Sequence, residues 1–250
     1  GFYPDIVVNA AAYPAVDKAE AEEEAAFAVN AHGAANVAAA AAVAGLPVIH
    51  LSTDYVFSGD GDRPWREDDR TAPQGAYGRS KLAGEEAVRA ANPRHAILRT
   101  SWVYAPFGHN FVRTMLRLAE DREVVRVVAD QHGAPTYAPD IAGGILAVAK
   151  IALAEPQADR WRGLFHMTAA GETTSGPYCE ARAATKISVP NESLNRTVVA
   201  SSALMSSALA TKRVMTLTGP RPMLWKRLNE AATASASKSV PSWNFTPAGI

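Results

Sequence analysis

The sequence predicts an α/β fold in which a mostly parallel, doubly wound sheet carries helices on both faces. Short apolar runs alternate with alanine-rich or amphipathic segments from residue 6 to about residue 167, as in parallel sheets with crossover helices. The 250-residue chain is 48% apolar and 20% charged, which is typical of a globular protein. Its single cysteine, Cys179, excludes an internal disulfide framework.

Each element follows from the local pattern of residues. We expect buried strands where short apolar runs end in small or turn-forming residues, at residues 6–11, 48–53, 96–104, 124–128 and 163–167. Helices are expected between them, at residues 17–44, 76–91, 111–121 and 140–153. The first helix is expected in two pieces with a hinge near Asn30 and Gly33.

The composition of the chain changes near residue 175. Residues 1–175 carry 16 basic and 22 acidic side chains, whereas residues 176–250 carry 9 and 3 and are rich in Ser, Ala and Thr. Such a break is typical of a domain boundary, a disordered tail or a sequence of different origin. We therefore predict a domain at residues 1–175 followed by an atypical basic tail at residues 176–250.

Charge and hydropathy argue against two classes of partner. Because 25 basic side chains balance 25 acidic ones, nothing in the net charge favours nucleic acid or an anionic membrane. The longest apolar run, residues 34–51, is interrupted by Asn36, Pro47 and His50, so we do not expect it to span a membrane. We expect a cytoplasmic protein with no nucleic-acid or membrane partner.

Tyr77 and Lys81 stand four residues apart at the start of a predicted helix and so share one face. A nearby ammonium favours the phenolate, so Lys81 is expected to lower the pKa of Tyr77. Thr53 ends the preceding strand and offers a hydroxyl to the same substrate oxygen. These groups suit proton transfer to a carbonyl oxygen beside a nicotinamide. On spacing alone, a surface helix with a solvated lysine and a half-buried tyrosine is the favoured interpretation; with Ser52, Thr53 and Asp54 ending the preceding strand, the two interpretations are equally open.

Six longer motifs occur in one order and carry a family resemblance. They are NAAAY (9–13), VDKAE (16–20), STDYVF (52–57), YGRSK (77–81), RTSWVY (99–104) and DQHGAPT (130–136). Over about residues 3–175 this series resembles the dTDP-4-dehydrorhamnose reductases, which are extended short-chain dehydrogenases/reductases. The resemblance implies a Rossmann-like domain and reduction of the C4 ketone of dTDP-4-dehydro-L-rhamnose by NADPH or NADH. The product, dTDP-L-rhamnose, supplies cell-surface polysaccharide.

The resemblance also implies roles for individual residues. Tyr77 would be the catalytic acid, Lys81 its partner and a ribose ligand, and Thr53 the residue that orients the ketone. The residues implied to bind the cofactor are Ala11, Ala12, Tyr13, Tyr77 and Lys81. The residues implied to contact the sugar nucleotide are Thr53, Asp54, Tyr55 and Trp102. Some members bind Mg²⁺ at a dimer contact; no metal ligand is identified here, and a homodimer is compatible with the resemblance.

Two departures from the family lead to further expectations. The family begins with a strand and a glycine-rich phosphate-binding turn, so we expect a sheet lacking its first βαβ unit, with a small carboxy-terminal substrate-side lobe. The chain alone is then expected to bind cofactor poorly and to show little activity. The tail is expected to be disordered or translated from a shifted reading frame. Open alternatives are a non-catalytic regulatory subunit like that of methionine adenosyltransferase, a sugar-nucleotide epimerase or dehydratase, and an inactive gene fragment.

Overall fold

The computed structural model of the protein describes residues 4–122 and 131–174. Residues 4–101 and 136–168 belong to one compact unit, and residues 102–122, 131–135 and 169–174 belong to a second. The strand predicted at residues 124–128 and the tail predicted at residues 176–250 lie outside the described residues.

The first unit is built on a four-stranded parallel sheet in the order β1-β2-β3-β7. Its strands are β1 (Val7–Asn9), β2 (Val48–Thr53), β3 (His95–Thr100) and β7 (Gly163–His166). Thr53 pairs with Thr100 where β2 and β3 end, so the residues that follow these strands begin at one edge of the sheet. The predicted parallel α/β fold is confirmed.

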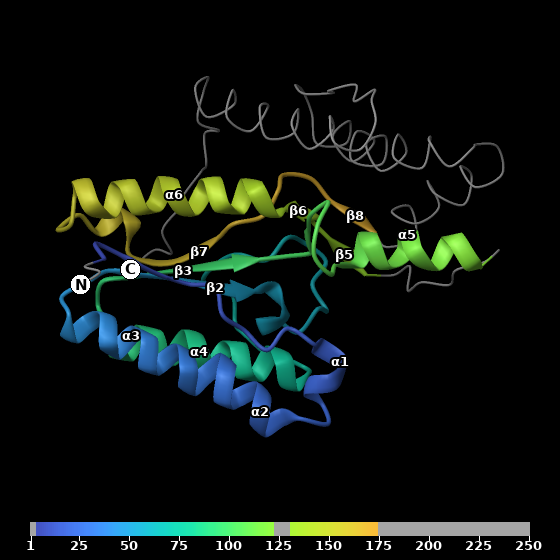
Figure 1. Cartoon of the computed structure of the whole chain (residues 1–250), viewed down its shortest axis with the longest axis horizontal. Helices are drawn as coiled ribbons and strands as arrows, with labels where there is room; N and C mark the ends of the chain where they lie inside the picture. The colour runs from blue at the N-terminus through green and yellow to red at the C-terminus, as the bar shows by residue number, and fades with distance from the viewer. Residues whose placement is uncertain (1–3, 123–130, 175–250) are drawn as a thin grey trace, which may run out of the picture. The chain divides into compact units, whose positions relative to one another are not determined.

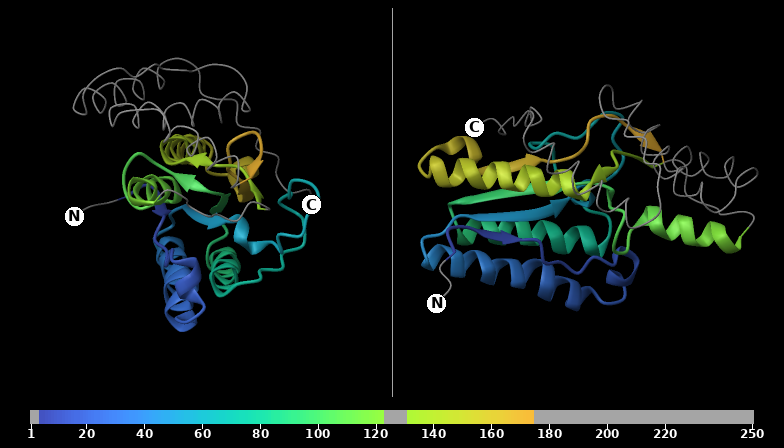
Figure 2. Two further views of the ribbon diagram at one scale, coloured as in Figure 1. Left: turned by 90° about the vertical axis from the view of Figure 1, so that its right-hand side faces the viewer. Right: turned by 45° about the horizontal axis from the view of Figure 1, so that its top comes forward.

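Helices cover both faces of this sheet (Figure 1). One face carries a nearly continuous helical run and a second helix: α1 (Val16–Ala19), α2 (Glu23–Phe27), the π-helical turn η1 (Ala28–Gly33), α3 (Ala34–Val43) and α4 (Ala76–Ala91). The opposite face carries α6 (Ala138–Ala154), and Figure 2 shows the sheet between these two layers. Short elements complete the unit: the 3-10 turns η2 (Asp54–Val56) and η3 (Asp159–Trp161), and β6 (Thr136–Tyr137).

Alternating side chains of the strands divide the apolar core into two layers. Ile49 and Leu98 are buried in the cluster that includes residues of α6, whereas Val48 and Ile97 are buried with residues of α3 and α4. This follows from the two-residue period of a strand, which sends neighbouring side chains to opposite faces. Each central strand buries apolar side chains on both faces, as a sheet covered on both sides requires, and both strands also bury polar residues such as Ser52 and Arg99.

The structure corrects two of the predicted elements. The hinge expected near Asn30 and Gly33 is wrong, because the helical run continues from Glu23 to Val43 through the π-helical turn η1 and the break lies at residues 20–22, between α1 and α2. The single strand expected at residues 96–104 is wrong, because β3 ends at Thr100 and β4 (Val103–Tyr104) is separate. Between them Trp102 has a φ of 43°, a left-handed conformation outside the β region that a regular strand needs.

The second unit contains few regular elements among its described residues. They are β4, α5 (Phe111–Asp121), β5 (His132–Gly133) and β8 (Thr173–Thr174). β5 and β8 pair antiparallel, with His132 opposite Thr174. The side chain of Asn110 accepts a hydrogen bond from the Arg113 N–H at 3.1 Å and caps the start of α5.

One helical run in the described part of the chain has the length and apolar composition to cross a membrane, at Glu23–Val43. In the structure, α2, η1 and α3 of this run contact α4. Ala34, Ala38 and Ala41 are buried against the sheet and α4. One face of the run therefore packs against the sheet and α4, where its alanines allow close approach.

Gly84 provides a test of how closely α4 packs. A Cβ atom at this position would lie 2.1 Å from the Asn30 carbonyl oxygen, whereas one at Gly143 on α6 would meet nothing within 4 Å. We expect Gly84→Ala to lower the free energy of unfolding by about 1–3 kcal/mol. Gly143→Ala is expected to raise it by up to about 1 kcal/mol, because alanine favours helix. Urea unfolding measures both, and a Gly84→Ala protein as stable as its parent would contradict this packing.

Candidate active site

The amino terminus of α4 brings the predicted tyrosine and lysine to the end of β2. The Thr53 hydroxyl accepts a hydrogen bond from the Tyr55 N–H at 3.2 Å, and Thr53 lies close enough to the Tyr77 phenol to lower its pKa. The ring of Tyr55, in η2, meets the ring of Tyr77 edge-on at 5.6 Å between centroids. Three residues predicted from distant motifs therefore lie in contact.

Two features fix the start of α4 against the rest of this unit. The Ala76 N–H donates to the Glu20 Oε1 at 2.7 Å, which satisfies a helix-terminal donor that no residue of the helix can accept. At Gly78 a Cβ atom would lie 2.3 Å from the Tyr55 carbonyl oxygen. Since only glycine permits this approach, Gly78 sets how close Tyr77 comes to η2.

Lys81 lies one helical turn further along and is almost fully buried, at 2% exposure. Its Nζ donates to the Leu51 carbonyl oxygen in β2 at 2.7 Å. Burial lowers the pKa of Lys81 to about 8, and the charge of Glu85 opposes that shift. The ammonium is thus held against the strand that ends in Thr53.

The expected effect of Lys81 on Tyr77 is wrong for the protein without ligands. Burial raises the pKa of Tyr77 to about 12, and the nearby Thr53 hydroxyl only partly offsets this. Asp54 and Tyr55 raise the pKa further through their negative charge. Desolvation of the half-buried phenol therefore decides the pKa of Tyr77. The Lys81 Nζ is directed to the Leu51 carbonyl oxygen instead. At neutral pH the phenol is protonated, which is the form that a proton donor needs.

Asp54 is a titrating group beside this pair. Its Oδ1 accepts a hydrogen bond from the Thr53 hydroxyl at 3.2 Å. Burial raises the pKa of Asp54 to about 6, so this carboxyl changes charge just below neutral pH. Tyr55, the next residue, is 44% exposed, and its ring presents a surface to solvent.

The segment predicted to lie along the cofactor follows β1, the neighbour of β2. Ala11 and Ala12 are exposed and their small side chains leave open space after the strand. The Ala11 N–H donates to the Asn9 Oδ1 at 3.2 Å, and the Tyr13 hydroxyl donates to the Glu22 Oε2 at 2.6 Å. Trp102 lies in the second unit, where its indole packs close to Gly133.

Asn30 is a polar residue of this region whose contacts the sequence analysis missed. It is fully buried; its Oδ1 accepts from the Tyr13 N–H at 2.8 Å, and its Nδ2 donates to the Ser80 Oγ at 2.9 Å. It therefore ties the segment after β1 to α4 beside Lys81. The available signal was an asparagine inside an alanine-rich helix. Its amide does not stabilise the helix itself, so its presence indicates a hydrogen-bond partner elsewhere in the fold.

Comparison with known proteins assigns the family. The sequence model described as RmlD substrate binding domain matches residues 1–228. The chain belongs to the RmlD substrate binding domain family. The match extends past the boundary predicted at residue 175, and the two domain ranges stay a prediction.

Relatives of this RmlD-type chain are named dTDP-4-dehydrorhamnose reductase. The protein of Sinorhizobium fredii is 56% identical over 171 residues, which are 68% of this chain and 57% of that protein. The Burkholderia thailandensis protein is 40% identical over an alignment of 250 residues, covering 97% of this chain and 79% of that protein. The chain thus spans somewhat more than half the length of the first relative.

Solved structures of similar proteins share the fold. A dTDP-4-dehydrorhamnose reductase from Clostridium acetobutylicum has a TM-score of 0.66 at 40% identity, covering 71% of this chain and 60% of that one. The Bacillus anthracis reductase in complex with NADP has a TM-score of 0.66 at 37% identity, covering 75% and 64%. The family resemblance inferred from the six motifs is confirmed.

Proposed function

We propose that this chain carries the proton-transfer site of an NAD(P)H-dependent sugar-nucleotide ketoreductase. Its reaction is reduction of the C4 ketone of dTDP-4-dehydro-L-rhamnose to give dTDP-L-rhamnose. The observation that carries the proposal is the approach of the Tyr77 phenol to Thr53 at the end of β2, one helical turn from the buried Lys81 ammonium. The relatives named above support the substrate, and they lend no support to the regulatory-subunit alternative.

The described residues suit a nicotinamide cofactor. Ala11 and Ala12 are small and exposed after β1, and parallel sheets bind nucleotides beyond the carboxyl ends of their strands. These two residues, Tyr13, Tyr77 and Lys81 are the residues that would hold it, and the B. anthracis reductase was solved with NADP. When bound, the cofactor supplies a hydride to the C4 carbon.

The chain's own residues supply the proton and the orientation. When substrate binds, the Thr53 hydroxyl turns its one proton from the Asp54 Oδ1 to the ketone oxygen and holds that oxygen beside Tyr77. The Tyr77 hydroxyl then gives its proton to that oxygen as negative charge develops there. Lys81, whose Nζ is held at the Leu51 carbonyl oxygen, is the proposed ligand of the cofactor ribose.

Asp54, Tyr55 and Trp102 are the proposed contacts to the sugar nucleotide. A carboxylate such as Asp54 accepts hydrogen bonds from sugar hydroxyls, and the exposed ring of Tyr55 offers a flat apolar face. We place the reaction in the cytoplasm and propose a homodimer without nucleic-acid or membrane partners. A metal-dependent step is not part of the proposal, since the described residues contain no group of three or more His, Cys, Asp or Glu placed to hold an ion.

An enzymatic assay tests the proposed function. The chain is assayed alone and fused behind the strand and glycine-rich turn that the family resemblance implies, with dTDP-4-dehydro-L-rhamnose and NADPH. Loss of reduced-nicotinamide absorbance and formation of dTDP-L-rhamnose are expected from the fusion protein. A folded fusion protein that binds NADPH yet leaves this ketone unreduced would refute the proposal.

A further inference from the structure

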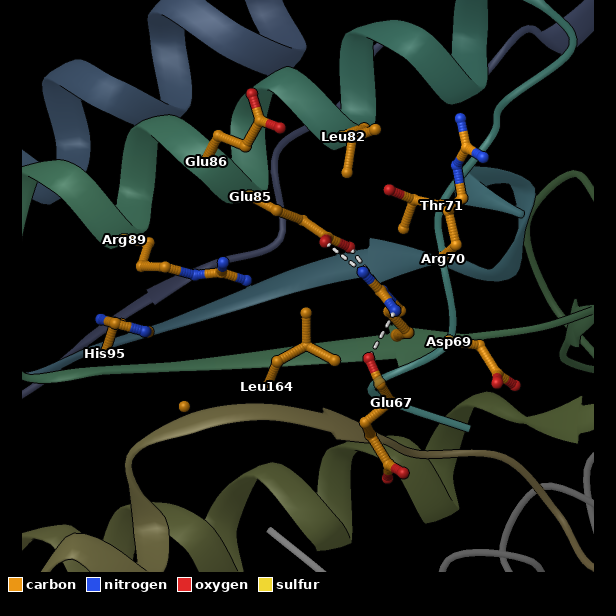
Figure 3. A pocket seen from close by; sticks show the side chains of 12 residues that line it. Glu67, Asp69, Arg70, Thr71, Leu82, Glu85, Glu86, Arg89, His95 and Leu164 are labelled. Carbon is orange, nitrogen blue, oxygen red and sulfur yellow. Dashed lines mark hydrogen bonds and ion pairs between the residues drawn. The ribbon is translucent and has the colours of Figure 1, made fainter. Parts of the chain in front are cut away.

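The buried charged side chains that line a pocket of about 540 Å³ beside α4 are paired with each other (Figure 3). Glu85 is 1% exposed, and its carboxylate accepts two hydrogen bonds from Arg99, from Nε at 2.9 Å and from Nη2 at 2.7 Å. The Ser52 hydroxyl donates to the same carboxylate at 2.5 Å. These three side chains form a polar cluster whose buried charges compensate each other, so the pocket needs no ligand to stabilise them.

The second unit contains a contact of another kind, between an indole and a glycine. Trp102 is the first residue of this unit, and Gly133 lies in β5. A Cβ atom at Gly133 would lie 2.4, 2.7 and 2.8 Å from the Cε2, Nε1 and Cζ2 atoms of the Trp102 indole. Because packed side chains do not approach so closely, the indole lies directly against a backbone that carries no side chain.

The indole, and not the local backbone, is what requires a glycine at residue 133. The φ of Gly133 lies outside the left-handed range that favours glycine, so an alanine can adopt the same backbone conformation. Gly133 belongs to the motif DQHGAPT at residues 130–136, which the proposed function leaves without a role. The contact with Trp102 supplies one for its glycine.

The backbone of Trp102 has a conformation that bulky residues avoid. Its φ is 43°, and the left-handed region is unfavourable for an L-residue because the Cβ atom approaches a backbone carbonyl oxygen. Such outliers persist only where the surrounding structure holds them, and they are found preferentially at ligand sites. The contact with Gly133 is one of the interactions that hold Trp102 in this conformation.

The backbone of Gly133 is itself held by neighbouring residues of the second unit. β5 pairs with β8, so that Gly133 lies opposite Thr173 and His132 lies opposite Thr174. Beside this pairing, the His132 Nδ1 lies 2.5 Å from the Glu172 Oε1. The surface against which the indole packs is therefore part of a paired strand.

We propose that Gly133 is a positioning residue for Trp102, and that the paired strands β5 and β8 form the support that orients the indole for contact with the sugar nucleotide. The catalytic meaning of this inference rests on the proposed function, in which Trp102 contacts the substrate. The placement of the indole is a property of the chain without ligands and is tested separately.

Fluorine NMR of the chain labelled with 5-fluorotryptophan tests the placement of the indole. The chain has five tryptophans, and Trp102→Ala identifies the resonance of Trp102. Gly133→Ala is expected to shift this resonance more than the other four, because the added methyl group displaces the indole. The matched control is Gly143→Ala, at a position where a Cβ atom meets nothing within 4 Å. An unmoved Trp102 resonance in folded Gly133→Ala, or an equal shift in the control, overturns the proposal.

The double variant Gly133→Ala with Trp102→Ala covers the case in which crowding prevents Gly133→Ala from folding. Without the indole the methyl group has space, so the double variant is expected to be as stable as Trp102→Ala alone in urea unfolding. This non-additivity is the signature of two residues that act through one contact. If Gly133→Ala destabilises the Trp102→Ala protein as much as it destabilises the parent, the glycine does not act through the indole and the proposal fails.

Steady-state kinetics of the fusion protein separates positioning from a purely structural role. Gly133→Ala is expected to raise KM for dTDP-4-dehydro-L-rhamnose by about tenfold and to change kcat less, as loss of a binding contact does. An unchanged KM in a folded variant overturns the positioning role. If the parent fusion protein leaves the ketone unreduced while the Trp102 resonance still shifts in Gly133→Ala, the proposed function fails and the support for the indole stands.

Discussion

Replacement of Tyr77 by phenylalanine is expected to lower kcat for the proposed ketone reduction by at least about 10²-fold, or about 2.7 kcal/mol in the barrier. The change removes only a hydroxyl. That hydroxyl is the proposed proton donor and lies close to Thr53, whereas the half-buried ring keeps its edge-on contact with Tyr55. The free energy of unfolding is therefore expected to change far less than the rate.

The matched control is Tyr137→Phe, which removes a phenolic hydroxyl from β6 in the same unit. Both variants are compared with the parent by steady-state kinetics and by urea unfolding. A Tyr77→Phe protein that turns over as fast as the parent would show that the proton comes from another group. Equal loss in both variants would point to a general effect on the fold.

Removal of the guanidinium of Arg99 is expected to have the largest effect on stability. Arg99→Met leaves the Glu85 carboxylate 1% exposed with Ser52 as its remaining hydrogen-bond donor from the cluster. Breaking a buried ion pair in this way costs about 3–5 kcal/mol, because one charge stays buried without compensation. The free energy of unfolding from urea titration measures the loss.

Arg160→Met is the control for this prediction. Arg160 pairs with Glu155, and their side chains are 60% and 47% exposed, so the loss is expected to be below about 1 kcal/mol. The two substitutions are chemically identical and differ in burial. If Arg99→Met were no more destabilising than Arg160→Met, solvent would have to reach the Glu85 carboxylate.

The sequence predicts most of the described sheet and helices because their patterns are local. Val48–Thr53 and Ala76–Ala91 have the predicted bounds, since glycine, proline or asparagine stands at their ends. The strand predicted through Trp102 is wrong because its apolar pattern continues through a residue with positive φ. A backbone turn stabilised by packing leaves no trace in hydropathy.

The sequence names candidate residues for the site, which stay a prediction, but it does not show their electrostatics. Motif spacing identified Tyr77, Lys81 and Thr53, and the structure brings Tyr77 and Thr53 close together. Motif spacing did not reveal that Lys81 is directed to the Leu51 carbonyl oxygen, or that Glu85 and Arg99 form a buried pair. Both depend on which strand lies beside α4, and the pKa of a phenol depends on how deeply it is buried.

The π-helical turn at Ala28–Gly33 constrains how the length of this part of the chain can vary in evolution. Such a turn holds one residue more than an α-helical turn. Deleting one residue inside η1 would leave a continuous α-helical turn, and α2 and α3 would keep their relative orientation. The same deletion inside α3 would rotate everything before it by about 100° and swing Ala26 away from the buried cluster that it forms with Ala76. Homologous chains are therefore expected to lose a residue within Ala28–Gly33 more readily than within α3.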